Sequence, residues 1–271
     1  MSAAPLLDLH VWGDPSAVAR RLGSARFLAA VGPAELAQWQ RRAATAVLPP
    51  TCRGYHLEGP YLNSHLAGAL GRRACRPRVR VRELADLIEA GRGRVRLMTI
   101  APELPGAIAA IRWLRHHGVV ASLGHTDATY DQARRAIDAG ATSATHLFNR
   151  MRPWRHRDPG VIGAILDDAR VSVQVILDGV HVHPSAFRLL VQTAGPGRII
   201  LATDAVIDDA RRQGLLYSRQ AYYTAGGVLA GSALSLPVAM RHAVRWGGVT
   251  PQQARAMAST NPARLLGLPT R

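Results

Sequence analysis

Short apolar runs alternate with helix-like stretches along most of this chain. The run at residues 119–123 is followed by a stretch from Tyr130 to Ala139 with helical spacing, which stops at Gly140. Strand and helix repeated in this order are typical of a parallel sheet covered by helices. The pattern predicts eight strands, at residues 6–11, 25–31, 54–58, 95–100, 119–123, 142–146, 171–177 and 198–203.

Helix starts and chain length refine this prediction. Pro33-Ala34-Glu35, Pro184-Ser185 and Thr250-Pro251 each place a proline where a first helical turn accepts it. A length of 271 residues fits one (β/α)8 barrel, which typically needs about 250. No internal repeat or linker stands out, so residues 1–271 are predicted to form one barrel domain.

Two histidines end two of the predicted strands. His125 follows the run at residues 119–123, and His146 closes the run at 142–146. Because the carboxyl ends of parallel strands meet at one edge of a sheet, both imidazoles are expected there. Glu58 and Asp204 end two further runs. One Glu and two His match a catalytic zinc site with an open position for water, and an added Asp is suited to act as a base.

Each of these residues also has an ordinary structural interpretation when it is taken alone. Glu58 would cap a loop, His125 would cap the following helix, and His146 would be a core histidine. Asp204 would be a partner in a strand-end salt bridge. The combination of all four at strand ends favours the metal site.

Seven motifs in the same order carry a family resemblance. Together they resemble the N-acetylglucosamine-6-phosphate deacetylases of the amidohydrolase superfamily, over about residues 6–268. The motifs are His-Leu-Glu-Gly-Pro-Tyr-Leu-Asn (56–63), Gly-His-Thr (124–126), Thr-His-Leu-Phe-Asn-Arg-Met (145–151), Asp-Gly-Val-His (178–181), Thr-Asp-Ala (203–205), Leu-Ala-Gly-Ser (229–232) and Asn-Pro-Ala-Arg-Leu-Leu-Gly-Leu (261–268).

The resemblance implies a metal-dependent hydrolase that removes the N-acetyl group from an amino sugar, N-acetylglucosamine 6-phosphate first of all. Glu58, His125 and His146 match the family's metal ligands, and Asp204 matches its catalytic aspartate. Asp204 is expected to take a proton from metal-bound water, whose hydroxide attacks the amide, and to pass it to the departing amine. One divalent metal, zinc, is predicted.

The resemblance also implies substrate contacts. In the family, an arginine at one of these positions reaches across from a partner subunit, so a homodimer is expected. Arginine suits phosphate because its planar group donates two hydrogen bonds at once. An exposed loop arginine is the alternative for Arg157. The matching substrate-binding positions are Asn149, Arg150, Arg157, His181, Leu229, Ala230 and Gly231.

The chain departs from the family pattern at several places. Trp12 stands where many amidohydrolases carry the second His of His-x-His, and indole cannot ligate a metal. The chain also contains no Lys that carbamylation could turn into a bridging ligand, so one metal is expected. Leu70 replaces the histidine that polarises the acetyl carbonyl, and His65 is a candidate substitute. The family's small β-sandwich is expected to be absent.

Charge and composition narrow the function classes. The net charge is +16, and the chain contains 34 arginines and no lysine. Because they are spread over most predicted helices rather than along one face, nucleic-acid binding is disfavoured. No apolar run is long enough to cross a membrane, and the first eight residues lack a signal-peptide pattern. Two cysteines favour a reduced, cytoplasmic setting.

Two alternatives remain open from the sequence. The first is a diverged amidohydrolase of a specialised pathway, acting on another N-acylated substrate. The second is a catalytically inactive barrel that serves as a binding protein. The presence of all four residues Glu58, His125, His146 and Asp204 argues against the second alternative.

Overall fold

A computed structural model describes residues 4–207 and 214–270 of the chain. The chain forms two compact units. The central unit comprises residues 30–47 and 54–171, and the terminal unit comprises residues 1–29, 48–53 and 172–271. Both units are α/β, with mostly parallel strands and helices that follow them in sequence.

The central unit carries four parallel strands in sequence order. Their register brings Glu58 opposite Thr99, Thr99 opposite Ser122, and Ser122 opposite Ser143. The strand ends therefore lie in one row. These strands are β3 (Cys52–Glu58), β4 (Val95–Ile100), β5 (Val120–Leu123) and β6 (Ser143–Ala144).

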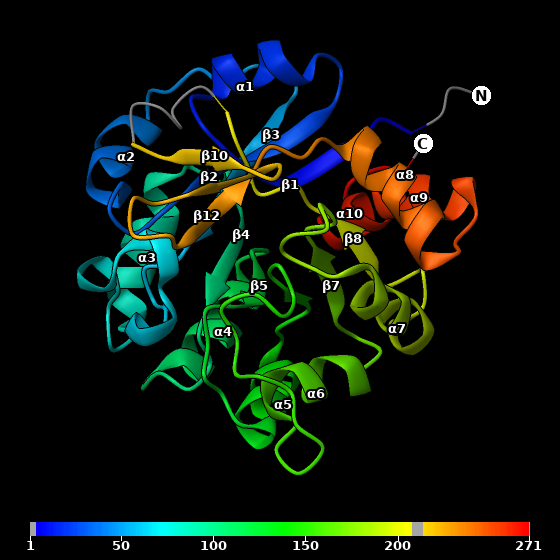
Figure 1. Cartoon of the computed structure of the whole chain (residues 1–271). Helices are drawn as coiled ribbons and strands as arrows, with labels where there is room; N and C mark the ends of the chain where they lie inside the picture. The colour runs from blue at the N-terminus through cyan, green and yellow to red at the C-terminus, as the bar shows by residue number, and fades with distance from the viewer. Residues whose placement is uncertain (1–3, 208–213, 271) are drawn as a thin grey trace. The chain divides into compact units, whose positions relative to one another are not determined.

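Five helices pack one after another in the same unit, and Figure 1 shows α5 beside α6. Helix α5 has the boundaries that the sequence predicts. Thr129 and Gln132 form a capping box at its start, and Gly140 ends it with a φ of 122°. The helices are α2 (Leu36–Ala43), α3 (Val81–Ala90), α4 (Ala107–His116), α5 (Tyr130–Ala139) and α6 (Gly160–Asp167). Three short 3-10 turns follow β3, at Ser64–Leu66, Gly68–Leu70 and Arg72–Ala74.

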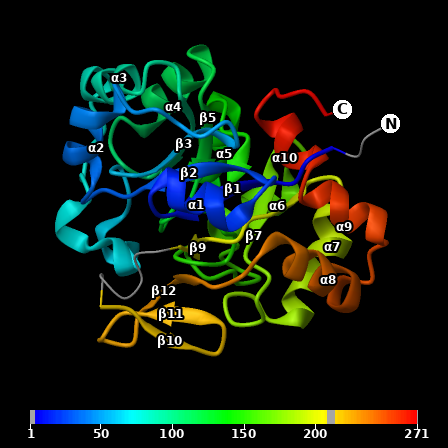
Figure 2. The same cartoon turned by 90° about the horizontal axis from the view of Figure 1, so that it is seen from above.

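The terminal unit is built around β1 (Leu7–Trp12), which pairs in parallel with β2 (Arg26–Val31) and with β9 (Ala205–Val206). Strand β12 (Leu229–Ser232) joins β9 in parallel, and β11 and β10 continue as an antiparallel ribbon, seen in Figure 2. The remaining elements are α1 (Pro15–Leu22), β7 (Ser172–Val175), α7 (Pro184–Ala194), β8 (Ile199–Leu201), β10 (Leu216–Ser218), β11 (Ala221–Tyr223), α8 (Leu236–Gly247), α9 (Pro251–Met257) and α10 (Thr260–Leu265).

All eight predicted strands correspond to observed strands, β1 to β8. Five are shorter than predicted, β2 and β5 by one residue each and β6, β7 and β8 by three residues each. Strands β9 to β12 were not predicted, since each has only two to four residues and no clear apolar alternation.

Two predicted helix starts are confirmed, and the third lies three residues before the observed start of its helix. Helix α7 begins at Pro184 and α9 begins at Pro251. The segment Pro33-Ala34-Glu35 forms a turn instead, and α2 begins at Leu36. The Glu35 carboxylate accepts a hydrogen bond from the Gly32 N–H at 3.1 Å, and this turn leads directly into α2. No helix in residues 4–207 and 214–270 has the length and apolar character needed to cross a bilayer.

Candidate metal centre

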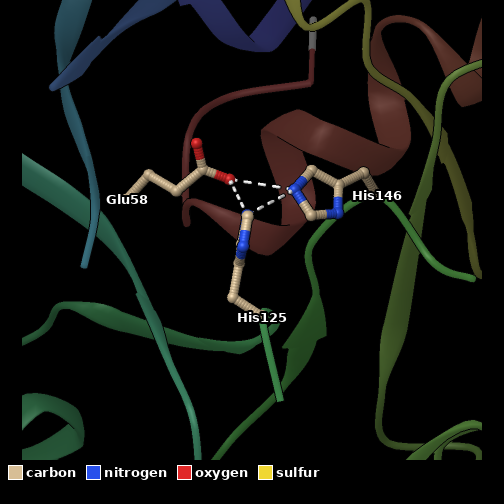
Figure 3. Close-up of side chains that lie close together, drawn as sticks. All are labelled: Glu58, His125 and His146. Carbon is tan, nitrogen blue, oxygen red and sulfur yellow. Dashed lines mark hydrogen bonds and ion pairs between the residues drawn. The ribbon is translucent and has the colours of Figure 1, made fainter. Parts of the chain in front are cut away.

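Three predicted ligands of the central unit converge on one another. The Oε1 atom of Glu58 lies 3.1 Å from Nε2 of His125 and 2.9 Å from Nε2 of His146. The two Nε2 atoms are 3.2 Å apart, and all three side chains are buried (Figure 3). In residues 4–207 and 214–270, this is the one group of three such side chains with ligand atoms within 4.8 Å of one another.

The proton positions in this cluster favour a cation. The Nδ1 atom of His125 lies 2.8 Å from the backbone carbonyl oxygen of Leu66, which can only accept a hydrogen bond. A neutral His125 therefore carries its hydrogen on Nδ1 and presents a lone pair at Nε2. That lone pair faces the Glu58 carboxylate, so a contact of 3.1 Å is repulsive unless a positive charge lies between them.

Protonation of both imidazoles would not resolve the contact. Two positive rings would then face each other with nitrogens 3.2 Å apart at one carboxylate oxygen. Ligands bound at about 2.0–2.1 Å to a tetrahedral zinc ion are about 3.3 Å from each other. The three observed separations, 2.9, 3.1 and 3.2 Å, are close to this spacing, so the residues fit a divalent metal.

The three predicted ligands lie at strand ends, and two of them have an unusual backbone conformation. Glu58 is the last residue of β3, while His125 and His146 come just after β5 and β6. His125 has a φ of 48° and His146 a φ of 32°, in the left-handed region that non-glycine residues seldom adopt. Such strain persists at sites whose function requires it, so it supports a functional role.

A chain of buried hydroxyl groups holds the strand ends together. The Thr145 hydroxyl lies 2.8 Å from that of Thr99 and 2.7 Å from that of Ser122, and Thr99 lies 2.7 Å from His56 Nε2. A side chain at Gly124 would place its Cβ 2.8 Å from the Thr99 methyl carbon. Only glycine therefore allows the chain to turn from β5 into His125 against this network.

Glu103 ties the loops around the cluster to one another. Its carboxylate accepts hydrogen bonds from the Thr126 hydroxyl at 2.5 Å, the Asp127 N–H at 2.8 Å and the Asn63 amide at 3.0 Å. The Asn63 N–H also donates to the His125 carbonyl oxygen at 2.9 Å. One carboxylate thus fixes the residue that follows His125 and the loop that follows Glu58.

The family model for the amidohydrolase family matches residues 32–271. The chain belongs to the amidohydrolase family. Its curated relatives include the N-acetylgalactosamine-6-phosphate deacetylase of Escherichia coli O157:H7, 41% identical over 79% of this chain and 59% of the relative. The N-acetylglucosamine-6-phosphate deacetylase of Vibrio furnissii is 39% identical over 79% of this chain and 55% of its own length.

Solved structures agree with this assignment. A mutant N-acetyl-D-glucosamine-6-phosphate deacetylase from Mycobacterium smegmatis, in complex with N-acetyl-D-glucosamine-6-phosphate, is similar with a TM-score of 0.89 and 38% identity. The likeness covers 98% of this amidohydrolase and 78% of that chain. The predicted resemblance is confirmed. The amidohydrolase spans less than two thirds of the length of the curated relatives named above.

In the terminal unit of this amidohydrolase, Asp204 follows β8 with a φ of 52°. Its side chain is 13% exposed. The Trp12 indole donates a hydrogen bond to Asp204 Oδ1 at 2.7 Å, and His10 Nε2 lies 3.4 Å from the same oxygen. In the sequence, Trp12 stands out only as a departure from a metal motif. In the structure, it makes a polar contact with the predicted catalytic residue.

Asp8 and Ser232 fix the backbone around Asp204. The Asp8 carboxylate accepts hydrogen bonds from the Thr203 N–H at 3.2 Å and the Thr203 hydroxyl at 2.6 Å. The Ser232 N–H donates to the Asp204 carbonyl oxygen at 2.9 Å. Burial raises the pKa of Asp8 from 3.8 to about 6, although the hydrogen bonds from Thr203 and His10 and the nearby His10 charge oppose the rise.

The other predicted substrate positions of the terminal unit lie in two places. Leu229, Ala230 and Gly231 form most of β12, and a Cβ at Gly231 would come within 2.9 Å of the Asp204 carbonyl oxygen. His181 Nδ1 lies 2.6 Å from Asp178 Oδ2, and the His181 side chain is 4% exposed. Burial alone would raise the pKa of Asp178, but its hydrogen bonds from His181 and two backbone N–H groups lower it.

The predicted substrate positions of the central unit follow His146. The Asn149 amide donates to the carbonyl oxygens of His146 and Leu147 at 3.2 and 3.3 Å. The Arg150 guanidinium packs on Gly68, where a Cβ would come within 2.5 Å of Nε. Arg157 is exposed on the loop between His146 and α6.

Sequence reasoning missed Glu103, Asp8 and the contact made by Trp12. Glu103 carried a usable signal, since it comes three residues after β4 as Asp204 comes three residues after β8. Asp8 had none, because an acid inside an apolar run is not distinguishable by pattern from an outward-facing residue.

Proposed function

We propose that this amidohydrolase removes the N-acetyl group from a 6-phosphorylated amino sugar, N-acetylglucosamine 6-phosphate first of all. The observation that carries the proposal is the buried convergence of Glu58, His125 and His146, with separations that suit one metal ion. The names of the relatives supply the substrate class.

We further propose the single (β/α)8 barrel over residues 1–271 that the sequence predicts. Strand and helix alternate within each unit, and the likeness to the mycobacterial structure covers 98% of the chain. A homodimer in which Arg157 serves the partner's site belongs to the same proposal, which its exposed position supports.

Glu58, His125 and His146 would hold one divalent cation, zinc by its ligand set. Bound there, such an ion supplies Lewis-acid polarisation and makes water more acidic. The rest of the chemistry falls to the chain's own residues. Those residues must bind the sugar, orient its amide and move one proton.

Asp204 is the proposed proton carrier. Its carboxylate accepts a proton from the attacking water and returns it to the amide nitrogen as the C–N bond breaks, because an unprotonated amine is a poor leaving group. A mostly buried side chain on strained backbone suits this role, since it meets the substrate in one orientation.

The proposed binding contacts reach parts of the substrate away from the bond that breaks. Arg157 is proposed for the phosphate, and Asn149, Arg150, His181 and the β12 backbone at Leu229, Ala230 and Gly231 for the sugar. The Asp178 contact supports the role of His181, because it fixes the imidazole with Nε2 directed away from Asp178.

The test is acetate release from purified protein with N-acetylglucosamine 6-phosphate, N-acetylgalactosamine 6-phosphate and their unphosphorylated forms. The galactosamine isomer is included because the relative from E. coli that shares 41% identity is named for it. We expect turnover of a phosphorylated sugar and a loss of about 10²–10⁴-fold in kcat for Asp204→Asn, with metal content unchanged. Metal-loaded wild-type protein that releases no acetate from any of the four sugars would refute the proposal.

A further inference from the structure

The carboxylate of Asp204 receives its contacts on one oxygen. The Trp12 indole Nε1–H donates to Oδ1 at 2.7 Å, and His10 Nε2 lies 3.4 Å from that oxygen. Within the described residues, no hydrogen bond reaches Oδ2. The two oxygens therefore differ, since Oδ1 is engaged by β1 and Oδ2 is left for another partner.

The Asp204 side chain is held by the last residue of the neighbouring strand. Trp12 is the last residue of β1, and β1 pairs with β9, which begins directly after Asp204. The Asp204 main chain is held by Ser232, and Thr203 is held by Asp8. With the backbone fixed on both sides, rotation of the carboxylate is the freedom that remains, and the indole hydrogen bond removes it.

An indole is suited to this task because its N–H donates only and does not titrate. It engages Oδ1 without taking up or releasing a proton. A hydrogen bond to a carboxylate at this length is charge-assisted and stronger than a neutral one. His10 and Trp12 point to the same side of β1, with ring centres 5.6 Å apart, so the two rings border Asp204 together.

We infer that Trp12 is a positioning residue which orients Asp204 so that Oδ2 carries the proton during catalysis. This inference rests on the proposed function for the role of Asp204, and on the hydrogen bond for its own content. Trp12 then contributes to the rate of the chemical step and does not contribute to substrate affinity.

The first test compares two tryptophan variants. Trp12→Phe removes the donor and keeps an aromatic ring. Trp39→Phe is the matched control, because Trp39 is buried and its Nε1 has no hydrogen-bond acceptor in the described part of the chain. We expect kcat of Trp12→Phe to fall about 10- to 100-fold with KM within about twofold, in line with a hydrogen bond to a charged group. Trp39→Phe should keep kcat within about twofold.

A double variant separates positioning from general damage. If Trp12 acts through Asp204, adding Trp12→Phe to Asp204→Asn costs no further activity. A further loss of the same size as in the wild-type background would assign Trp12 a separate structural effect and overturn the inference.

A readout without turnover tests the contact itself. Labelling with ¹⁵N-tryptophan gives indole N–H signals for the five tryptophans, and Trp12→Phe identifies the one of interest. We expect slow solvent exchange of this N–H in the wild type and faster exchange with a shifted signal in Asp204→Ala. An unchanged signal in Asp204→Ala overturns the inference.

The two proposals fail in different ways. Wild-type protein that holds metal and shows the protected indole N–H, but turns over no N-acetyl sugar, refutes the proposed function. Wild-type protein that is active, with Trp12→Phe equal to it in kcat, refutes the positioning role and leaves the proposed function intact.

Discussion

The imidazole of His125 donates through Nδ1 to the backbone carbonyl oxygen of Leu66, at 2.8 Å. Leu66 closes the first 3-10 turn after β3, so the loop that follows one proposed ligand fixes the ring orientation of another. Second contacts of this kind orient metal ligands and raise their affinity. The contact therefore orients the His125 ring so that Nε2 faces the Glu58 carboxylate.

Metal content tests the cluster directly. We expect one divalent ion per chain in purified protein, and less than about a tenth of that in His146→Ala after dialysis, since two ligands hold zinc weakly. His116→Ala is the matched control, because His116 is exposed at the end of α4. Two ions per chain, or full metal in His146→Ala, would contradict the prediction.

Glu103 should set the affinity of the cluster without touching the ion. Glu103→Gln weakens its hydrogen bonds to Thr126, Asp127 and Asn63, and so loosens the loop that carries His125. We expect metal affinity, measured by competition with a chelator, to fall about 10- to 100-fold. Glu83→Gln, which alters a surface ion pair with Arg76 and Arg80, should leave that affinity unchanged.

Arg157 is predicted to act on substrate binding. Removing an arginine–phosphate contact costs about 1.5–3 kcal/mol, so KM of Arg157→Ala should rise about 10- to 150-fold with kcat preserved. The exposed Arg155 of the same loop offers the control variant Arg155→Ala. Unchanged KM in Arg157→Ala, or equal turnover of the unphosphorylated sugar, would show that Arg157 does not read a phosphate.

Asp8 predicts an unusual dependence of stability on pH. Its pKa is about 6 in the folded chain against an ordinary value of 3.8, so the folded state holds a proton that the unfolded state has lost. Its contribution to stability is therefore full below about pH 4 and is lost as the pH rises through 6. The change amounts to about 3 kcal/mol.

Urea unfolding of wild type and Asp8→Asn at pH 4 and pH 7.5 measures this contribution. The amide keeps an acceptor for the Thr203 and His10 N–H groups and cannot ionise. Between the two pH values, the free energy of unfolding of the variant should gain about 3 kcal/mol relative to wild type. Parallel pH profiles for the two proteins would show that Asp8 does not carry the effect.

The sequence predicted the first eight strands and the convergence of Glu58, His125 and His146 at strand ends, because both depend on local pattern. Each of the eight predicted apolar runs contains a strand, and His125 and His146 follow two of these strands. The β10–β11 ribbon escaped prediction because its residues 216–218 are all exposed and lack an apolar face. The predicted helix start at Pro33 lies three residues before the first residue of α2, Leu36, because residues 33–35 form a turn that leads into the helix.

The contacts between distant segments could not be predicted. Trp12 and Asp204 are 192 positions apart, and nothing in either motif indicates that an indole would replace a metal ligand with a hydrogen-bond donor. The position of Glu103 just after β4 could have indicated a functional residue. Its role, however, depends on three partners from two different loops.

Left-handed backbone at His125, His146 and Asp204 has a consequence for how this chain would change over generations. Each position bears a cost of about 1 kcal/mol or more that glycine would relieve. A lineage freed from the need for chemistry would gain robustness by giving up these side chains, one mutation at a time. Glycine at these three positions would therefore stabilise the fold while removing the site. The two histidines and the aspartate are present at a cost in stability.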